Sequence, residues 1–177
     1  MSHATQDTGE ATASGDPAPA DLLRLARETY RNEIGDARGG ARAAEVFSTR
    51  VDEILQLLHA RAAHPVAAVA LVAIGGYGRR HLCLHSDLDL LFLFDGQIAA
   101  AEKQFVTELL HPLWDLGLNI GQQVRKFDEL GEVQPDNPEF LVALRDARFL
   151  AGDTGLFARF DTIVRGARSV WRQPTID

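Results

Sequence analysis

The stretch IGGYGRRHLCLHSDLDLLFLF, residues 74–94, contains the features that decide the fold. Gly75 and Gly76 follow the apolar run VAAVALVAI, and Asp87 and Asp89 lie at the start of a second apolar run, LDLLFLF. Short, continuous apolar runs of this kind are typical of strands that are covered on both faces. We therefore predict two buried strands joined by a polar loop at the centre of the fold.

The two aspartates are the first candidate functional residues. Residues i and i+2 of a strand point to the same face, so Asp87 and Asp89 are predicted to project together while Leu88 and Leu90 enter the core. Two neighbouring carboxylates repel each other, and a cation between them removes that repulsion. A site with two protein carboxylates suits Mg²⁺, which keeps several waters and completes its shell with substrate phosphates. Asp87 and Asp89 are therefore candidate metal ligands and catalytic residues.

The loop between the two runs has the residue types that bind phosphate. Gly75 and Gly76 let the backbone approach a ligand without an intervening side chain, and a helical turn after them could present free N–H groups to an anion. Arg79 adds a cationic fork, and the Ser86 hydroxyl can bind a phosphate oxygen. His85, beside Ser86, is a further candidate phosphate contact. A triphosphate on one side and a metal ion on the other are what nucleotidyl transfer requires.

Helices are predicted before this core. Residues 1–20 have almost nothing to bury and are predicted to form a disordered tail. Residues 21–66 are predicted to be an N-terminal helical segment, in which two helices are separated by the turn GDARGG. We expect the first helix to bury a face that includes Leu25, and the second to carry Asp52 and Glu53 on its solvated face.

The predicted nucleotidyltransferase core covers residues 67–130. After the two strands it continues with a helix over 99–114 and a third strand within GLNIGQQVRKF, 117–127. Residues 131–177 are predicted to be a helical extension of two helices separated by AGD, with Asp153 as an N-cap. The predicted fold class is thus α/β, in a mixed α+β arrangement: a small mixed sheet flanked by N- and C-terminal helices.

Composition limits the partners. The chain has 177 residues, of which 46% are hydrophobic, and 18 Lys and Arg against 25 Asp and Glu give a net charge of −7. This charge argues against binding driven by the charge of nucleic acid or anionic lipid. The longest apolar run is too short to span a membrane, no signal pattern is present, and Cys83 alone cannot form an internal disulfide. We expect a cytoplasmic protein in which Cys83 is a small core residue.

The spacing of these motifs resembles a known superfamily. Gly-Gly at the end of a buried strand, ten intervening residues and then Asp-x-Asp resemble the DNA polymerase β-like nucleotidyltransferases. GGYGRRHLCLHSDLDLL is more closely similar to the bifunctional uridylyltransferase/uridylyl-removing enzymes of nitrogen signalling, which modify PII proteins. The similarity continues through LWDLGLNIGQQVR, 113–125, and ALRDARFLAGDTGLF, 143–157.

This resemblance implies a polymerase β-like core and a reaction. The reaction is Mg²⁺-dependent transfer of UMP from the nucleoside triphosphate UTP to a tyrosine of a PII-type protein, with release of pyrophosphate. Asp87 and Asp89 would hold two Mg²⁺ ions, and four residues would contact the phosphates: Gly75, Gly76, Arg79 and Ser86. Full-length relatives also have a phosphohydrolase domain and glutamine-sensing domains, so we expect this chain to correspond to the N-terminal part of such an enzyme.

The sequence departs from the resemblance at three points. Arg80 stands where the family usually has glycine, and Leu84 stands where proline is common. The superfamily often adds a third carboxylate on a later strand, where this chain offers Gln122 and Gln123, with Asp128 beyond them. One of these residues, or a water, is expected to take that place.

Two other functions remain open from the sequence. One is a different nucleotidyltransferase, such as one that transfers AMP to a protein or small molecule, because no residue in the sequence identifies the base. The other is a non-catalytic nucleotide-binding module, because the third carboxylate is missing. Transfer from labelled nucleotides distinguishes the first of these from uridylyl transfer, and nucleotide binding without pyrophosphate release would identify the second.

Overall fold

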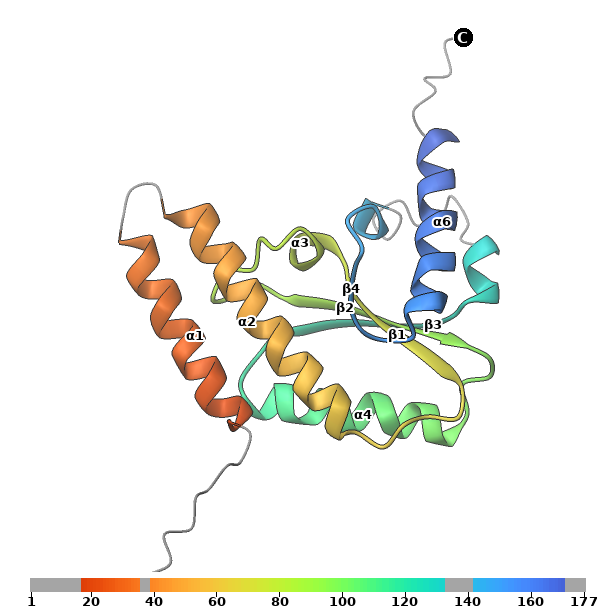
Figure 1. Cartoon of the computed structure of the whole chain (residues 1–177), viewed down its shortest axis with the longest axis horizontal. Helices are drawn as coiled ribbons and strands as arrows, with labels where there is room; N and C mark the ends of the chain where they lie inside the picture. Colours follow the sequence, from red (N-terminus) through yellow and green to blue (C-terminus); the bar gives the residue numbers. More distant parts are fainter. Residues whose placement is uncertain (1–16, 36–38, 133–141, 171–177) are drawn as a thin grey trace, which may run out of the picture.

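A four-stranded mixed sheet forms the centre of the computed structural model, which describes residues 17–35, 39–132 and 142–170 (Figure 1). The strand order is β3-β2-β1-β4; β1 is antiparallel to β2 and β4, and β2 is parallel to β3. The strands are β1 (Ala68–Ala73), β2 (Leu88–Asp95), β3 (Ile120–Lys126) and β4 (Arg148–Gly152).

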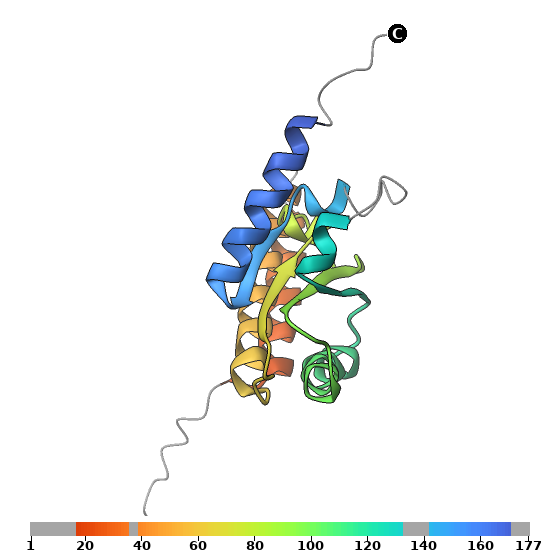
Figure 2. The same ribbon diagram turned by 90° about the vertical axis from the view of Figure 1, so that its right-hand side faces the viewer.

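Helices lie on both faces of this sheet (Figures 1 and 2). They are α1 (Pro19–Ile34), α2 (Gly40–Arg61), α3 (Gly75–Gly78), α4 (Ala100–Asp115), the 3-10 helix η1 (Asp128–Glu132) and α6 (Thr154–Val170). Helices α1, α2 and α4, which we call the helical layer, share one hydrophobic core with one face of the sheet. Helix α6 packs on the opposite face. The mixed α/β fold class predicted from the sequence is confirmed.

The sequence of β2 shows why both faces are covered. Leu88, Leu90 and Phe92 are buried against the helical layer, whereas Leu91 and Leu93 are buried in the core beneath α6. Alternate residues of a strand point to opposite faces, so a continuous apolar run needs cover on both sides. The side chains of β2 therefore alternate between the core of the helical layer and the core beneath α6.

The prediction of two C-terminal helices separated by AGD is wrong at residues 148–152. These residues form β4, which pairs with β1 on the side away from β2. The segment RFLAG is a short apolar stretch, and such a stretch does not distinguish a strand from a buried helix by its period. The predicted N-cap is confirmed, because the Asp153 carboxylate accepts the N–H of Leu156 at 2.7 Å at the start of α6.

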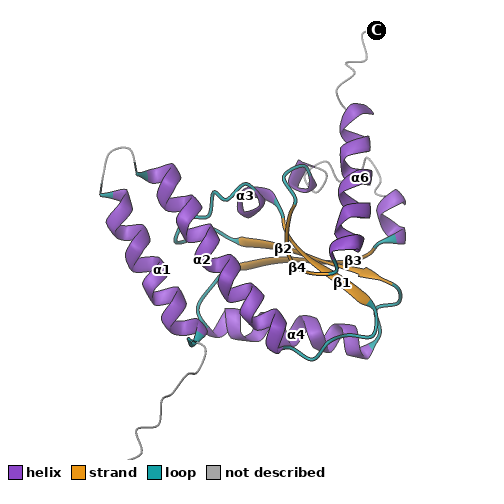
Figure 3. Ribbon diagram, viewed as in Figure 1, coloured by secondary structure: helices purple, strands orange, loops and turns teal. Residues whose placement is uncertain are grey.

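Figure 3 distinguishes the helices, strands and loops that the structure describes. Leu25 is 53% exposed, so it does not belong to the buried face of α1. Most of the predicted N-terminal tail, and residues 133–141 and 171–177 of the predicted helical extension, lie outside the described residues. Among the helices that the structure describes, none combines the length and hydropathy needed to cross a bilayer.

Candidate functional site

The two aspartates lie at the edge of the sheet where β2 begins. Asp87 precedes the strand and is exposed, while Asp89 is its second residue and is partly buried. Leu88 and Leu90 enter the helical layer, so Asp89 lies on the opposite face. Burial, and then the charge of Asp87, raise the pKa of the Asp89 carboxyl above its ordinary value. A cation at this position would relieve that repulsion.

Two glycines leave room for the Asp89 carboxylate. Gly75, directly after β1, has φ +60°, and a Cβ placed on it would lie 3.0 Å from Oδ2 of Asp89. Gly121 is the register partner of Asp89 on β3, and a Cβ there would collide with Oδ1. The carboxylate therefore lies between Gly75, which follows β1, and Gly121 of β3, and β1 and β3 are the strands on either side of β2. Sequence reasoning missed Gly121, although glycine inside a strand often marks a close approach.

The glycine turn, residues 75–78, is held close to the strands. The N–H of Ile74 donates to the Asp89 carbonyl at 3.1 Å, and the N–H of Gly78 donates to the Ile74 carbonyl at 3.0 Å. A Cβ on Gly78 would collide with the Asp146 carbonyl, so this glycine is required for packing against the chain before β4. Gly76 has open space, since the nearest atom to a Cβ there would be Nη2 of Arg79 at 4.0 Å.

The predicted phosphate-binding side chains occupy different positions around this turn. Arg79 is bound to Asp146, with Nη1 and Oδ2 2.7 Å apart, and the arginine is half exposed. Ser86 is exposed, and its Oγ accepts the N–H of Cys83 at 3.2 Å, which leaves the hydroxyl proton available. Cys83 is exposed, so the expectation of a core residue is wrong. Asp146 was not anticipated from the sequence.

A buried polar cluster supports the glycine turn from the helical layer. Asp52 of α2 accepts hydrogen bonds from the Tyr77 hydroxyl at 2.5 Å and from the Arg148 guanidinium at 2.6 and 3.0 Å. Arg148 also donates to the carbonyls of Tyr77 and Gly78, both at 3.2 Å. Asp52 is 6% exposed, which corrects the expectation of a solvated face. The cluster ties α2 and β4 to the turn that follows β1.

Arg80 has a left-handed backbone conformation, although it stands where the resembled family usually has glycine. Its φ is +62°, in the left-handed region where glycine is unstrained and arginine is not. The guanidinium donates to Oγ1 of Thr49 at 2.8 Å and lies 3.5 Å from Asp52. These contacts with α2 offset part of the backbone strain, so the turn keeps its shape without the glycine.

The strand register separates the candidates for a third ligand. Gln122 is opposite Leu90, whose side chain enters the helical layer, whereas Gln123 is opposite Leu91, on the face of Asp89. Nη2 of Arg125 donates to Oε1 of Gln123 at 3.3 Å. Asp128 follows the far end of β3, roughly 20 Å from Gly121 at about 3.3 Å per strand residue. The register thus argues against Asp128 and favours Gln123.

Within the described ranges, no group of three or more His, Cys, Asp or Glu residues is placed to hold a metal ion. A metal at this site would therefore depend on Asp87 and Asp89, with other oxygen ligands completing its shell.

A glycine turn after one strand and an Asp-x-Asp pair on its neighbour, in a small mixed sheet between helices, define a nucleotidyltransferase-type domain. Comparison with known families agrees. The model described as "Putative nucleotidyltransferase DUF294" matches residues 20–122, and the chain belongs to this family of enzymes.

Curated relatives are named bifunctional uridylyltransferase/uridylyl-removing enzymes. The chain is 35% identical over 156 residues to the enzyme from Azotobacter vinelandii, and the aligned region covers 88% of this chain and 17% of that relative. It is 36% identical over 158 residues to the Streptomyces coelicolor protein, covering 89% and 18%, and 38% identical over 144 residues to the Nitrosospira multiformis protein, covering 78% and 16%. The chain therefore spans about one sixth of the length of these relatives.

Proposed function

We propose that this domain transfers UMP from UTP to a tyrosine of a PII-type regulatory protein, with Mg²⁺, and releases pyrophosphate. One observation carries the proposal: the Asp89 carboxylate lies beside Asp87 and between Gly75 and Gly121. This places carboxylate oxygens next to a turn where backbone can approach a phosphate. The names of the relatives support the choice of UMP as the transferred group.

The residues present fit Mg²⁺. Asp87 and Asp89 supply hard oxygen ligands, and the raised pKa of Asp89 reflects in part a repulsion that a cation removes. The amide oxygen of Gln123 is on the same face and is the best placed further ligand. When bound, Mg²⁺ would lower the pKa of the attacking hydroxyl and neutralise charge on the phosphates.

The residues of the chain have separate tasks in this reaction. Gly75 and Gly76 bring the backbone close to the phosphates, and the Ser86 hydroxyl donates to a phosphate oxygen. Arg79 adds positive charge beside the turn, where Asp146 orients its guanidinium. The tyrosine oxygen attacks the α-phosphorus as the bond to the bridging β-phosphate oxygen breaks. Pyrophosphate leaves with that oxygen, and the phenolic proton passes to solvent.

Labelled nucleotides test this proposal. Incubate the chain with Mg²⁺, a PII protein and UTP, ATP, CTP or GTP labelled at the α-phosphate. The proposal expects label on a tyrosine from UTP alone, with equal pyrophosphate release. Label from ATP instead would identify an adenylyl-transferring enzyme. Metal-dependent nucleotide binding without any pyrophosphate release would favour a non-catalytic nucleotide-binding module.

A further inference from the structure

The edge of the sheet nearest to Asp89 is open. β3 is an edge strand, because the strand order is β3-β2-β1-β4. Each of its seven residues is at least partly exposed, whereas β1 and β2 are buried along most of their length. At the opposite edge, Nε2 of Gln56 on α2 donates to the Leu150 carbonyl of β4 at 3.1 Å. Natural sheets cover or blunt their edges because unpaired strand groups readily bind another chain, so the edge of β3 is a candidate interaction surface.

The pairing with β2 determines which backbone groups of β3 point outward. The N–H of Leu88 donates to the Asn119 carbonyl at 2.8 Å, and the N–H of Phe127 donates to the Phe94 carbonyl at 2.8 Å. Alternate residues of a parallel strand direct their N–H and C=O groups to the same neighbour, so the odd-numbered residues from 119 to 127 face β2. The residues of β3 whose backbone groups point outward are Ile120, Gln122, Val124 and Lys126.

Most of these outward groups are available for pairing. The N–H of Lys126 donates to Oε2 of Glu129 at 3.4 Å, which agrees with its outward direction. Across the ranges that the structure describes, no hydrogen bond engages the outward N–H and C=O groups of Ile120, Gln122 or Val124. These three residues can therefore donate to and accept from an added strand, which is how extended peptides bind exposed sheet edges.

Gly121 connects this edge to the reacting centre. It is the register partner of Asp89, so the two residues share a face of the sheet. A Cβ on Gly121 would collide with Oδ1 of Asp89, which shows that the carboxylate leans over β3 toward the open edge. An added strand would lie roughly 4.8 Å beyond β3. A tyrosine opposite Gly121 would project on the face of Asp89, with no side chain of β3 between its ring and the carboxylate.

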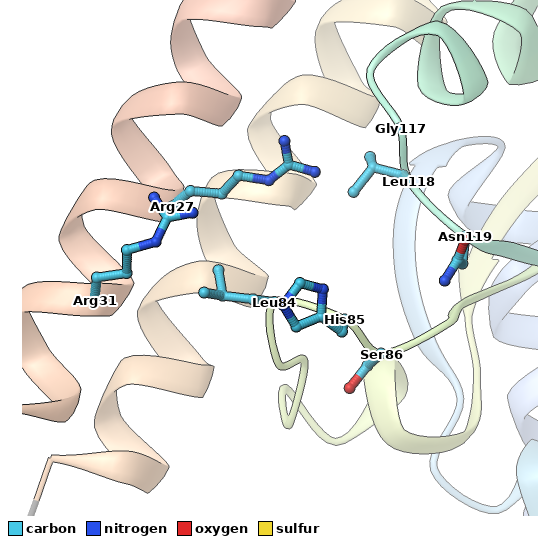
Figure 4. Close-up of a pocket in the computed structure, with 8 residues that line it drawn as sticks. All are labelled: Arg27, Arg31, Leu84, His85, Ser86, Gly117, Leu118 and Asn119. Atoms are coloured by element: carbon cyan, nitrogen blue, oxygen red, sulfur yellow. The ribbon is translucent and has the colours of Figure 1, made fainter.

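The geometry of the transfer also favours an acceptor on the β3 side. The glycine turn follows β1, and β3 lies on the other side of β2. The attacking and leaving oxygens are roughly in line, on opposite sides of the phosphorus, so pyrophosphate at the glycine turn places the acceptor toward β3. The pocket between α1 and the turns that precede β2 and β3 (Figure 4) does not offer this approach. Neither aspartate lines that pocket, and α1 belongs to the helical layer, on the opposite face from Asp89.

We propose that the acceptor segment that carries the modified tyrosine binds as an antiparallel strand along the outer edge of β3, with the tyrosine opposite Gly121. Antiparallel pairing is the commoner kind. In it, the tyrosine and Gly121 form a non-hydrogen-bonded pair, in which the Cα atoms approach to about 4.5 Å. The residues on either side of the tyrosine exchange hydrogen bonds with Ile120 and Gln122. This inference rests on the proposed function, because it assumes that the acceptor is a protein.

Backbone methylation of a peptide tests the pairing without requiring catalysis. A short blocked peptide with a central tyrosine, taken from the modified segment of a PII protein, is compared with two forms that each have one N-methyl group. One form is methylated on the residue after the tyrosine, whose N–H would bond to β3. The other is methylated on the tyrosine itself, whose N–H would point away from β3.

Binding of the three peptides to the whole chain is measured by NMR titration. The first methyl group should weaken binding roughly tenfold or more, because it removes a hydrogen bond and crowds the edge. The second should leave the affinity within twofold of the unmodified peptide. Equal effects of the two methyl groups, or no binding of the unmodified peptide, would overturn the inference.

Amide exchange shows which edge the peptide covers. In the free chain, the N–H groups of Gln122 and Val124 should exchange at least about tenfold faster than those of Gln123 and Arg125, which face β2. The unmodified peptide should slow exchange at Gln122 and Val124. Slow exchange at these positions in the free chain, together with dimerisation, would show that a second copy covers the edge and would overturn the inference.

Proline at position 122 gives a variant of the edge itself. Gln122→Pro removes an outward N–H and blocks an added strand, while the neighbouring residues keep their bonds to β2. Peptide binding should be lost in this variant, whereas Gln122→Ala keeps the N–H and should bind the peptide as the wild type does. Unchanged peptide binding by folded Gln122→Pro would overturn the inference. If Gln122→Pro does not fold, the methylated peptides decide the outcome.

Mg²⁺-UTP binding is measured on the same proteins to separate the two proposals. Gln122→Pro should bind Mg²⁺-UTP as the wild type does. UMP transfer to a PII protein by the wild type, without the expected methylation pattern, would overturn the docking site and leave the proposed function standing. The methylation pattern without any Mg²⁺-UTP binding would instead count against the proposed function and leave the docking site standing.

Discussion

Replacing Gly121 with alanine should disable the site and leave the fold intact. The new Cβ would collide with Oδ1 of Asp89. Gly75 flanks the carboxylate on its other side, where a Cβ built on Gly75 would lie 3.0 Å from Oδ2. The carboxylate must therefore move by on the order of 1 Å, a displacement that can lower a rate roughly 100-fold. Gly121 lies inside β3 and has no positive φ, so alanine gains about 0.5–1 kcal/mol from lower unfolded-state entropy.

The assay is Mg²⁺-dependent UMP transfer to a PII protein, with urea unfolding measured in parallel. We expect a loss of roughly 100-fold in transfer and a free energy of unfolding within about 1 kcal/mol of wild type. Gly40→Ala is the matched control, because a Cβ at this first residue of α2 meets nothing within 4 Å. The Gly40→Ala variant should transfer UMP at the wild-type rate. Transfer by Gly121→Ala within twofold of wild type would refute the placement of Asp89 at the reacting centre.

Three further predictions concern the support of the site. The free energy of unfolding should be about 1 kcal/mol higher for Arg80→Gly than for Arg80→Ala. Both variants lose the contacts with α2, but only glycine relieves the backbone strain at φ +62°. Equal urea midpoints for the two variants would contradict this prediction. Tyr77→Phe should lose about 1–2 kcal/mol by removing the hydroxyl that donates to Asp52, and an unchanged midpoint would show that Arg148 alone satisfies the carboxylate. The hydrogen bond from the N–H of Ala67 lowers the pKa of the Glu102 carboxyl, so the stability that this bond adds is present above about pH 4.5 and is lost as the pH falls. Glu102→Gln should flatten that part of the curve of unfolding free energy against pH. An unchanged slope in the variant would disprove the assignment.

The central strands and the aspartate pair could be predicted from the sequence because each depends on a local pattern. A continuous apolar run is a property of neighbouring residues, and the spacing of Asp87 and Asp89 on a strand sets their common face. The same reasoning failed for β4, because RFLAG is too short for its period to distinguish a strand from a helix. Its pairing with β1, residues distant in sequence, decides the outcome.

Residues that depend on distant partners could not be predicted. Asp52 is an unremarkable surface position in the pattern of α2, and its burial depends on Arg148, 96 residues away. Charged residues are rarely buried without such a partner, and a sequence pattern does not reveal one that is distant. Gly121 was missed for the same reason, since the side chain that requires it belongs to β2. Arg79 and Asp146, 67 residues apart, are a third example.

The most direct measurement of the central claim compares Asp89→Asn with wild type in Mg²⁺-dependent UMP transfer and in metal-free thermal unfolding. Asparagine keeps the volume and removes the charge, so transfer should fall by roughly two orders of magnitude or more. The melting temperature should be unchanged or slightly higher, because repulsion from Asp87 disappears. Near-normal transfer together with a clearly lower melting temperature would show that Asp89 is structural and would contradict the assignment of the site.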